Sequence, residues 1–172
     1  MEWHTEQLER DPDLKLLVWT RFVTELRYAA ERTVAERCAP DPTKHTVGVI
    51  CGQPVFMRRV DEERSAAKRL LHPEAAPRGP VTVFGTYGTG AMGINLTACH
   101  TVVNLTIDYS HTKAAQSAAR VDRPGQVHPV SYFDVVATGP QGQRTIDHAM
   151  VSSLSRGKPG CMNIWATTRT VS

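Results

Sequence analysis

The sequence predicts an α/β fold: one domain with a mainly parallel sheet of about five or six strands flanked by helices. Short, nearly continuous apolar runs such as LKLLVWT (14–20) are typical of strands buried on both faces of a parallel sheet. These runs alternate with stretches of helical spacing, which predicts parallel strands joined by right-handed crossovers. A length of 172 residues suits one domain and hardly two.

The first half of the chain alternates predicted helices and strands. Proline limits the helices, since Pro12 follows the first of them and Pro40 and Pro42 stop the second. In order, the predicted elements are a helix over Glu2–Arg10, a strand over Leu14–Thr20, a helix over Phe22–Cys38, a strand over His45–Gly52 and a helix over Asp61–Leu71.

The second half continues the alternation after a loop rich in proline and glycine. Its predicted elements are strands over Val81–Phe84 and His100–Ile107, a helix over Thr112–Val121, a strand over Pro129–Ala137 and a helix over Arg144–Leu154. The stretch from Gly157 to Ser172 has no clear pattern. We therefore expect a lead-in over 1–13, a folded domain over 14–158 and a tail over 159–172.

Composition excludes several classes of protein. The formal charge of +3 suits a polyanionic partner without demanding one, because 20 basic residues stand among 17 acidic ones. Four cysteines lie far apart without a C-x-x-C pair, which predicts reduced thiols and no metal site. No apolar run approaches the roughly twenty residues that span a bilayer, and the polar N-terminus does not resemble a signal peptide. A cytoplasmic protein is expected.

The stretch 81–108 contains a possible dinucleotide-binding fingerprint. Gly88, Gly90 and Gly93 spell G-x-G-x-x-G after a strand-like run, and Asp108 follows about twenty residues later. The context is poor, because three residues separate the strand from Gly88 and only about seven remain after Gly93 for a crossover helix. An NAD-binding Rossmann protein is therefore a lesser alternative. Taken alone, the stretch is better explained as a tight, flexible glycine loop.

Downstream, QSAARVDRPGQ (116–126) has the pattern Q-x-x-x-R-x-x-R-x-G-Q. Gln116, Arg120 and Arg123 would share one face of a helix that Pro124 ends. Arginine presents a planar fork of donors that matches phosphate oxygens, so two such side chains and an amide suit a polyphosphate. The alternative is a solvated basic face that pairs with acids such as Asp122.

The ordered set LVWTRF, VGVICGQ, GTGAMGINL, VVNLTIDYS, QSAARVDRPGQ and RTIDHAMVSSL resembles the second (C-terminal) RecA-like lobe of superfamily-two helicases, and within them the Swi/Snf-like DNA translocases. LVWTRF resembles motif IV, TYGTGAMGINLT motif V and QSAARVDRPGQ motif VI. The resemblance covers roughly Lys15 to Lys158. Two departures stand out: Tyr109, Ser110 and His111 occupy the places of a usual W-N-P, and Thr89 replaces the usual alanine of motif V.

The resemblance implies that ATP binds in a cleft between two RecA-like lobes. Arg120 and Arg123 would be catalytic, with Arg123 as the finger on the γ-phosphate. The residues implied to bind or sense the nucleotide are Gln116, Gly90, Gly93 and Asn95. The residues implied to contact the DNA backbone are Thr20, Arg21, Gly52 and Thr86. Such contacts are largely independent of sequence and weaken with salt.

The motifs of a first lobe are not found. No G-x-x-x-x-G-K-[ST] occurs, and DEER (61–64) fits a solvated helix start better than a magnesium box. The expected function is therefore the C-terminal lobe of an ATP-dependent DNA helicase or translocase. It would need a first lobe with Walker A and B motifs, in another chain or a longer parent, to hold ATP and Mg²⁺. The alternative is a non-catalytic adaptor that binds DNA or protein.

Overall fold

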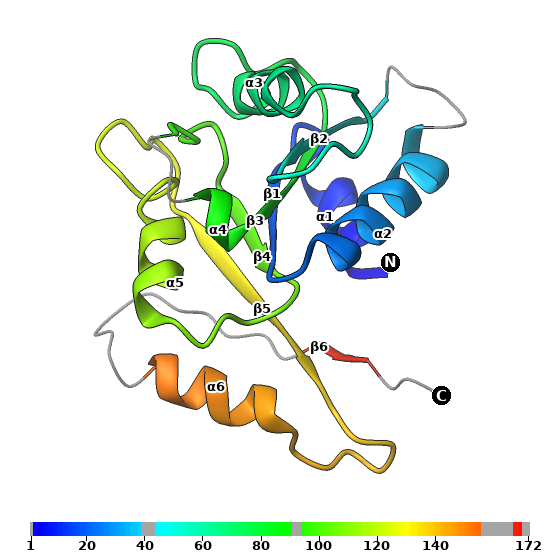
Figure 1. Cartoon of the computed structure of the whole chain (residues 1–172), viewed down its shortest axis with the longest axis vertical. Helices are drawn as coiled ribbons and strands as arrows, with labels where there is room; N and C mark the ends of the chain where they lie inside the picture. Colours follow the sequence, from blue (N-terminus) through cyan, green and yellow to red (C-terminus); the bar gives the residue numbers. More distant parts are fainter. Residues whose placement is uncertain (1, 39–43, 91–93, 156–166, 170–172) are drawn as a thin grey trace.

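The computed structural model describes residues 2–38, 44–90, 94–155 and 167–169 (Figure 1). Every helix and strand predicted from the sequence is present, with ends that shift by a few residues. In chain order the elements are α1 (Glu2–Arg10), β1 (Lys15–Thr20), α2 (Val23–Thr33), the π-helix η1 (Val34–Cys38), β2 (Thr46–Ile50), α3 (Val60–Leu70), β3 (Val81–Thr86), α4 (Tyr87–Gly90), β4 (Thr101–Asn104), α5 (His111–Ala118), β5 (Ser131–Ala137), α6 (Ile146–Ser155) and β6 (Thr167–Arg169).

The strands form one sheet in the order β2-β3-β1-β4-β5-β6, and every neighbouring pair is parallel. The predicted fold class is therefore confirmed. β1 lies between β3 and β4, with Thr20 paired to Thr86 and Trp19 paired to Asn104. The carboxyl ends of these three strands consequently meet at one edge of the sheet.

Helices cover both faces of the sheet, so the central strands β1 and β3 are buried on both sides. Leu17 and Trp19 of β1 enter one core together with Ala67 of α3. Leu16 and Val18 enter the opposite core, where α2 and α1 pack (Figure 1). This burial of alternate residues on two faces explains the nearly continuous apolar runs in the sequence.

Two elements were not expected from the sequence. The one-turn helix α4 forms in the glycine-rich stretch that reads as a loop. β6 pairs with the end of β5 in the segment without a clear pattern, through Val135↔Thr167 and its neighbours. Both elements contain four residues or fewer, which is too short to produce a recognisable hydrophobic period.

The acids of DEER (61–64) differ from the expected solvated helix start. α3 begins there, and Asp61 and Glu62 are exposed in its first turn. Glu63 is instead buried, and its carboxylate accepts hydrogen bonds of 2.6–3.3 Å from the backbone N–H groups of residues 55–57. The solvated reading is wrong for Glu63, because these donors replace the water that the carboxylate loses on burial.

Three cysteines, Cys38, Cys51 and Cys99, are free thiols in the described part of the chain, and Cys161 lies outside it. Within the same residues, no group of three or more histidines, cysteines or acids is arranged to hold a metal ion. None of the described helices combines the length and the apolar character that crossing a membrane requires.

Close packing across β1 and β3 generates a first prediction. Gly85 lies beside Trp19, and a methyl group on Gly85 would lie 2.4 Å from Cζ3 of the indole ring. We expect Gly85→Ala to lower the free energy of unfolding by about 1–3 kcal/mol in urea denaturation, the usual cost of overpacking. Gly88→Ala is the control, because its methyl group would meet nothing within 4 Å. Equal stability of the two variants would contradict the packing described.

Two buried histidines join α1 to the sheet. His45 Nε2 lies 2.9 Å from Thr82 Oγ1, and the His45 ring packs edge-on against His4 of α1 with centroids 5.5 Å apart. Burial, with the positive charge of Arg37 nearby, lowers the pKa of each imidazole from its ordinary 6.5 to about 4. Both rings are therefore neutral in the folded protein at neutral pH.

This pair predicts an acid-sensitive fold. Between pH 6.5 and 4 the unfolded chain binds more protons at His4 and His45 than the folded chain does. The free energy of unfolding should therefore be highest above pH 6.5 and fall as the pH drops towards 4. His4→Phe should reduce this slope, because it removes one of the two titrating groups. Phenylalanine suits the position, since His4 Nε2 is buried without a hydrogen-bond partner among the described residues. Urea midpoints measured at several pH values test this, and an unchanged slope in the variant would refute it.

Candidate functional site

The carboxyl ends of β1, β2 and β3 hold the residues that were predicted to contact DNA. Ligands bind open α/β sheets at this edge. Thr20 is fully buried, and its hydroxyl donates to the Phe22 carbonyl oxygen at 3.2 Å. Thr86 is also buried, whereas Arg21 and Gly52 are exposed. The structure therefore brings all four predicted residues to one edge, where Arg21 and Gly52 supply the exposed surface.

Thr89, which replaces the usual alanine of motif V, joins α4 to this edge through hydrogen bonds. Its hydroxyl lies 2.9 Å from the hydroxyl of Thr86 and 2.8 Å from the carbonyl oxygen of Ile50. An alanine could make neither contact. Thr89 consequently ties the start of motif V to the ends of both β3 and β2.

The Arg21 guanidinium lies between two exposed aromatic rings. Its central carbon is 5.1 Å from the ring centroids of both Phe22 and Tyr109. Cation–π attraction of about 0.5–1 kcal/mol per exposed contact restrains this charge at the edge of the sheet. Tyr109 is the first of the three residues that occupy the places of the usual W-N-P, and its ring contacts Arg21 in this chain.

A chain of hydrogen-bonded polar side chains connects α4 to the sheet. The Tyr87 hydroxyl donates to Asn104 Oδ1 at 2.9 Å, and Asn104 Nδ2 donates to Asp134 Oδ1 at 2.6 Å. The Tyr87 ring also stacks on Trp19, with centroids 5.9 Å apart. Burial, together with the charges of Asp134 and Asp108, raises the pKa of Tyr87, so the phenol is a neutral donor. This chain connects α4, β4 and β5.

The helix that carries motif VI is shorter than the sequence suggests. α5 ends at Ala118, so the expectation that Gln116, Arg120 and Arg123 project from one helical face is wrong. After Ala118 the backbone continues in tight turns, and the Val121 side chain enters the core fully buried. Burying Val121 therefore redirects the chain, and both arginines lie on the turns that follow the helix.

Motif VI packs directly against the end of motif V. Arg123 Nη1 donates to the Ile94 carbonyl oxygen at 3.4 Å, and the Leu96 N–H donates to the Arg120 carbonyl oxygen at 3.1 Å. Arg123 is exposed, whereas Arg120 is half-buried and engaged in further contacts. The arginine segment thus lies beside residues 94–96.

The other residues predicted to face the nucleotide are less closely grouped. Gln116 is exposed on α5, and half-buried Asn95 accepts a 3.3 Å hydrogen bond from the Thr97 N–H. Gly90 is the last residue of α4, and Gly93 lies outside the described residues. The structure joins motif V and motif VI through the backbone contacts above, without a direct contact between Gln116 and the arginines among the interactions described.

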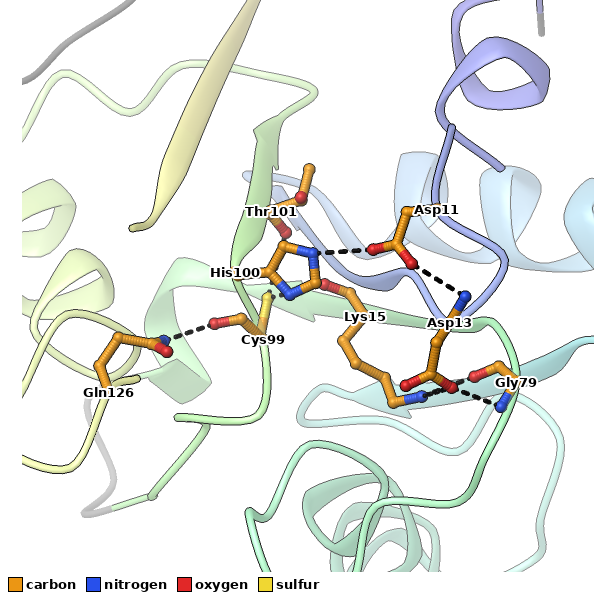
Figure 2. Close-up of polar contacts among 8 residues, drawn as sticks. All are labelled: Asp11, Asp13, Lys15, Gly79, Cys99, His100, Thr101 and Gln126. Atoms are coloured by element: carbon orange, nitrogen blue, oxygen red, sulfur yellow. Dashed lines mark hydrogen bonds and ion pairs between the residues drawn. The ribbon is translucent and has the colours of Figure 1, made fainter. Parts of the chain in front are cut away.

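Gln126, which ends motif VI, has a structural role near the amino ends of β1 and β4 (Figure 2). Gln126 Nε2 donates to the Cys99 carbonyl oxygen at 2.7 Å, and the Cys99 thiol lies 3.2 Å from the carbonyl oxygen of Lys15 in β1. Burial raises the pKa of Cys99 to about 12, so the thiol is a protonated packing group. Next to Cys99, His100 Nε2 lies 3.0 Å from Oδ2 of Asp11, the residue that directly follows α1.

Several residues of the site were missed by sequence reasoning. Tyr87, Asn104 and Asp134 form a network whose members come from three separate elements. Asp134 gave a usable signal, because an acid within the apolar strand SYFDVVA must find a partner when buried. Glu63 gave none, because its partners are backbone groups.

Comparison with known proteins relates the chain to ATP-dependent remodelling enzymes and helicases. No protein-family model matches it. A segment of 83 residues, 48% of the chain, is 34% identical to the chromatin-remodeling ATPase INO80 in two strains of Cryptococcus neoformans var. neoformans serotype D. The matched segment spans 4% of the length of these curated relatives.

Two solved structures share the fold over most of the chain. The C-terminal part of the Fun30 ATPase domain matches 88% of this chain and 43% of that one, with a TM-score of 0.62 and 16% identity. Domain 2 of the DEAD-box helicase Mss116p, solved bound to an RNA duplex, matches 96% and 57%, with a TM-score of 0.66 and 15% identity. The resemblance predicted from the motifs is thus confirmed: the chain is built like the second RecA-like lobe of superfamily-two helicases, and its sequence similarity lies with the Swi/Snf-like group.

Proposed function

We propose that the chain is the C-terminal lobe of an ATP-dependent DNA helicase or translocase of the Swi/Snf-like type. In this proposal Arg120 and Arg123 face the nucleotide, and the carboxyl edge of the sheet contacts the duplex backbone. A first lobe with Walker A and B motifs, in another chain or a longer parent, holds ATP and Mg²⁺. Hydrolysis requires both lobes.

The contact between motifs V and VI carries the proposal. Arg123 is exposed, yet its Nη1 bonds the Ile94 carbonyl oxygen, so the guanidinium has a defined starting position beside motif V. Its remaining N–H groups suit the oxygens of a triphosphate, because the planar fork makes several charge-assisted hydrogen bonds at once. An arginine placed against a γ-phosphate stabilises the charge that develops during phosphoryl transfer.

Contact with the DNA backbone is assigned to the edge formed by Thr20, Arg21, Gly52 and Thr86. Arg21 offers a charge for phosphate, restrained by two rings, and Gly52 lets a backbone approach closely because it has no side chain. Buried Thr20 and Thr86 keep the ends of β1 and β3 in register beneath that surface. Binding of this kind is insensitive to base sequence.

A lobe exchange tests the nucleotide-facing residues. The chain alone should show no DNA-stimulated ATP hydrolysis, whereas an INO80 ATPase whose second lobe is replaced by this chain should hydrolyse ATP. In the exchanged enzyme, Arg123→Ala and Arg120→Ala should each lower turnover by at least about 10³-fold, the typical contribution of an arginine finger, with little change in DNA affinity. Turnover by the isolated chain that Arg123→Ala abolishes would contradict the two-lobe requirement. DNA binding without turnover in the exchanged enzyme would favour the adaptor.

The DNA edge is tested separately on the isolated chain. Arg21→Ala should weaken duplex binding to a similar extent for unrelated sequences and reduce the slope of log K against log salt by about one. Tyr109→Ala should have a smaller effect, because it removes one of two rings that restrain the charge. Arg32→Ala is the control, since Arg32 is an exposed arginine of α2 paired with Glu36. Fluorescence anisotropy measures binding, and equal loss in the Arg21 and Arg32 variants would argue against a specific edge.

A further inference from the structure

The loop between β2 and α3 presents an apolar tip next to positive charge. Phe56 and Met57 are each 44% exposed, and the two residues that follow, Arg58 and Arg59, are also exposed. The loop leaves the carboxyl end of β2, the strand whose Ile50 pairs with Gly85 of β3. The tip formed by residues 55–59 therefore starts from the edge that carries Gly52 and Thr86.

The backbone of this tip is fixed from inside the protein. The buried Glu63 carboxylate accepts the N–H of Val55 on Oε2 at 2.9 Å, and those of Phe56 and Met57 on Oε1 at 2.6 and 3.3 Å. Arg27 Nη2 donates to the Pro54 carbonyl oxygen at 3.2 Å. A buried carboxylate needs such donors, so Glu63 and the tip backbone hold each other in place. The fold thus orders a segment whose two large apolar side chains remain partly exposed to water.

The charges around the tip suit a polyanion. Arg58 and Arg59 follow the apolar pair, and the exposed acids Asp61 and Glu62 come next, in the first turn of α3. Of the two arginines, only Arg59 has an acidic partner described, an exposed contact of 3.1 Å between its Nη1 and Glu62 Oε1. Such exposed pairs contribute little and exchange readily for phosphate. The carboxylate of Glu63 faces the tip backbone and is engaged by three backbone N–H donors.

We propose that residues 55–59 form a wedge for duplex DNA, with Phe56 and Met57 entering the minor groove and Arg58 and Arg59 contacting the adjacent phosphates. Apolar side chains of this kind partly unstack a base step and bend the duplex when they insert into the minor groove. The proposal rests on the DNA-binding function proposed above and adds a device that deforms the duplex. A fixed backbone favours this role, because the tip needs no ordering when it binds.

The test uses the whole chain and a short duplex that carries 2-aminopurine, whose fluorescence rises when a base is unstacked. The chain should raise this fluorescence at saturation, and Phe56→Ala/Met57→Ala should abolish the rise and weaken binding about tenfold. Phe56→Leu/Met57→Leu should keep most of the rise, since leucine also serves as a wedge. Arg58→Ala/Arg59→Ala should reduce the salt slope by about two. The matched control, Tyr28→Ala/Ile146→Ala, removes two side chains that are 64% and 63% exposed elsewhere, and should change nothing.

The other outcomes separate this proposal from the one on which it depends. Binding without a fluorescence rise, equal in wild type and in the Phe56/Met57 variant, would overturn the wedge and leave the DNA edge intact. No binding by the wild-type chain at low salt would overturn both. A wild-type dimer that the alanine variant converts to a monomer in sedimentation, with unchanged DNA binding, would make the tip a protein interface and overturn the wedge.

Discussion

Parallel pairing of β1 with β3 is the interaction on which the candidate site depends. The register places Thr20 beside Thr86 and Trp19 beside Gly85, where only a residue without a side chain leaves room for the indole ring. A slip of one residue would turn Trp19 to the opposite face and separate the two strand ends. The glycine of β3 therefore sets the alignment of the edge before any functional side chain is considered.

Most of the fold could be predicted because its signals are local. β1 and β3 are buried on both faces, so they appear as apolar runs, and α2 and α3 carry apolar residues at helical spacing. The residues of the carboxyl edge were implied by the resemblance alone, and each lies at the end of a predicted strand or within two residues of it. Whether each of these residues is buried or exposed could not be predicted, because the burial of Thr20 depends on neighbours that are distant in sequence.

The end of α5 shows why the remainder could not be predicted. Helical spacing from Gln116 to Arg123 is a property of the sequence, but the path of the chain is decided by Val121 entering the core and by Gln126 bonding the Cys99 carbonyl oxygen. These tertiary contacts outweigh a helix propensity worth only tenths of a kcal/mol per residue. In the same way, the contact of Arg21 with Tyr109 joins the end of β1 to the residue before the N-cap of α5, which no local pattern connects.

Motif V gives the proposed function a physical link between its two surfaces. At its start, Thr89 bonds the ends of β2 and β3, and Tyr87 is fixed to β4 through Asn104. At its end, the Ile94 carbonyl oxygen accepts Arg123. In the proposed function, a shift of Arg123 towards a phosphate would break this bond at the end of motif V, while the start of motif V stays bonded to the edge that is proposed to contact DNA. Coupling of this kind requires an element with two arrangements. Thr89 and Tyr87 bond α4 to β2, β3 and β4, so a second arrangement of α4 would first have to break these hydrogen bonds.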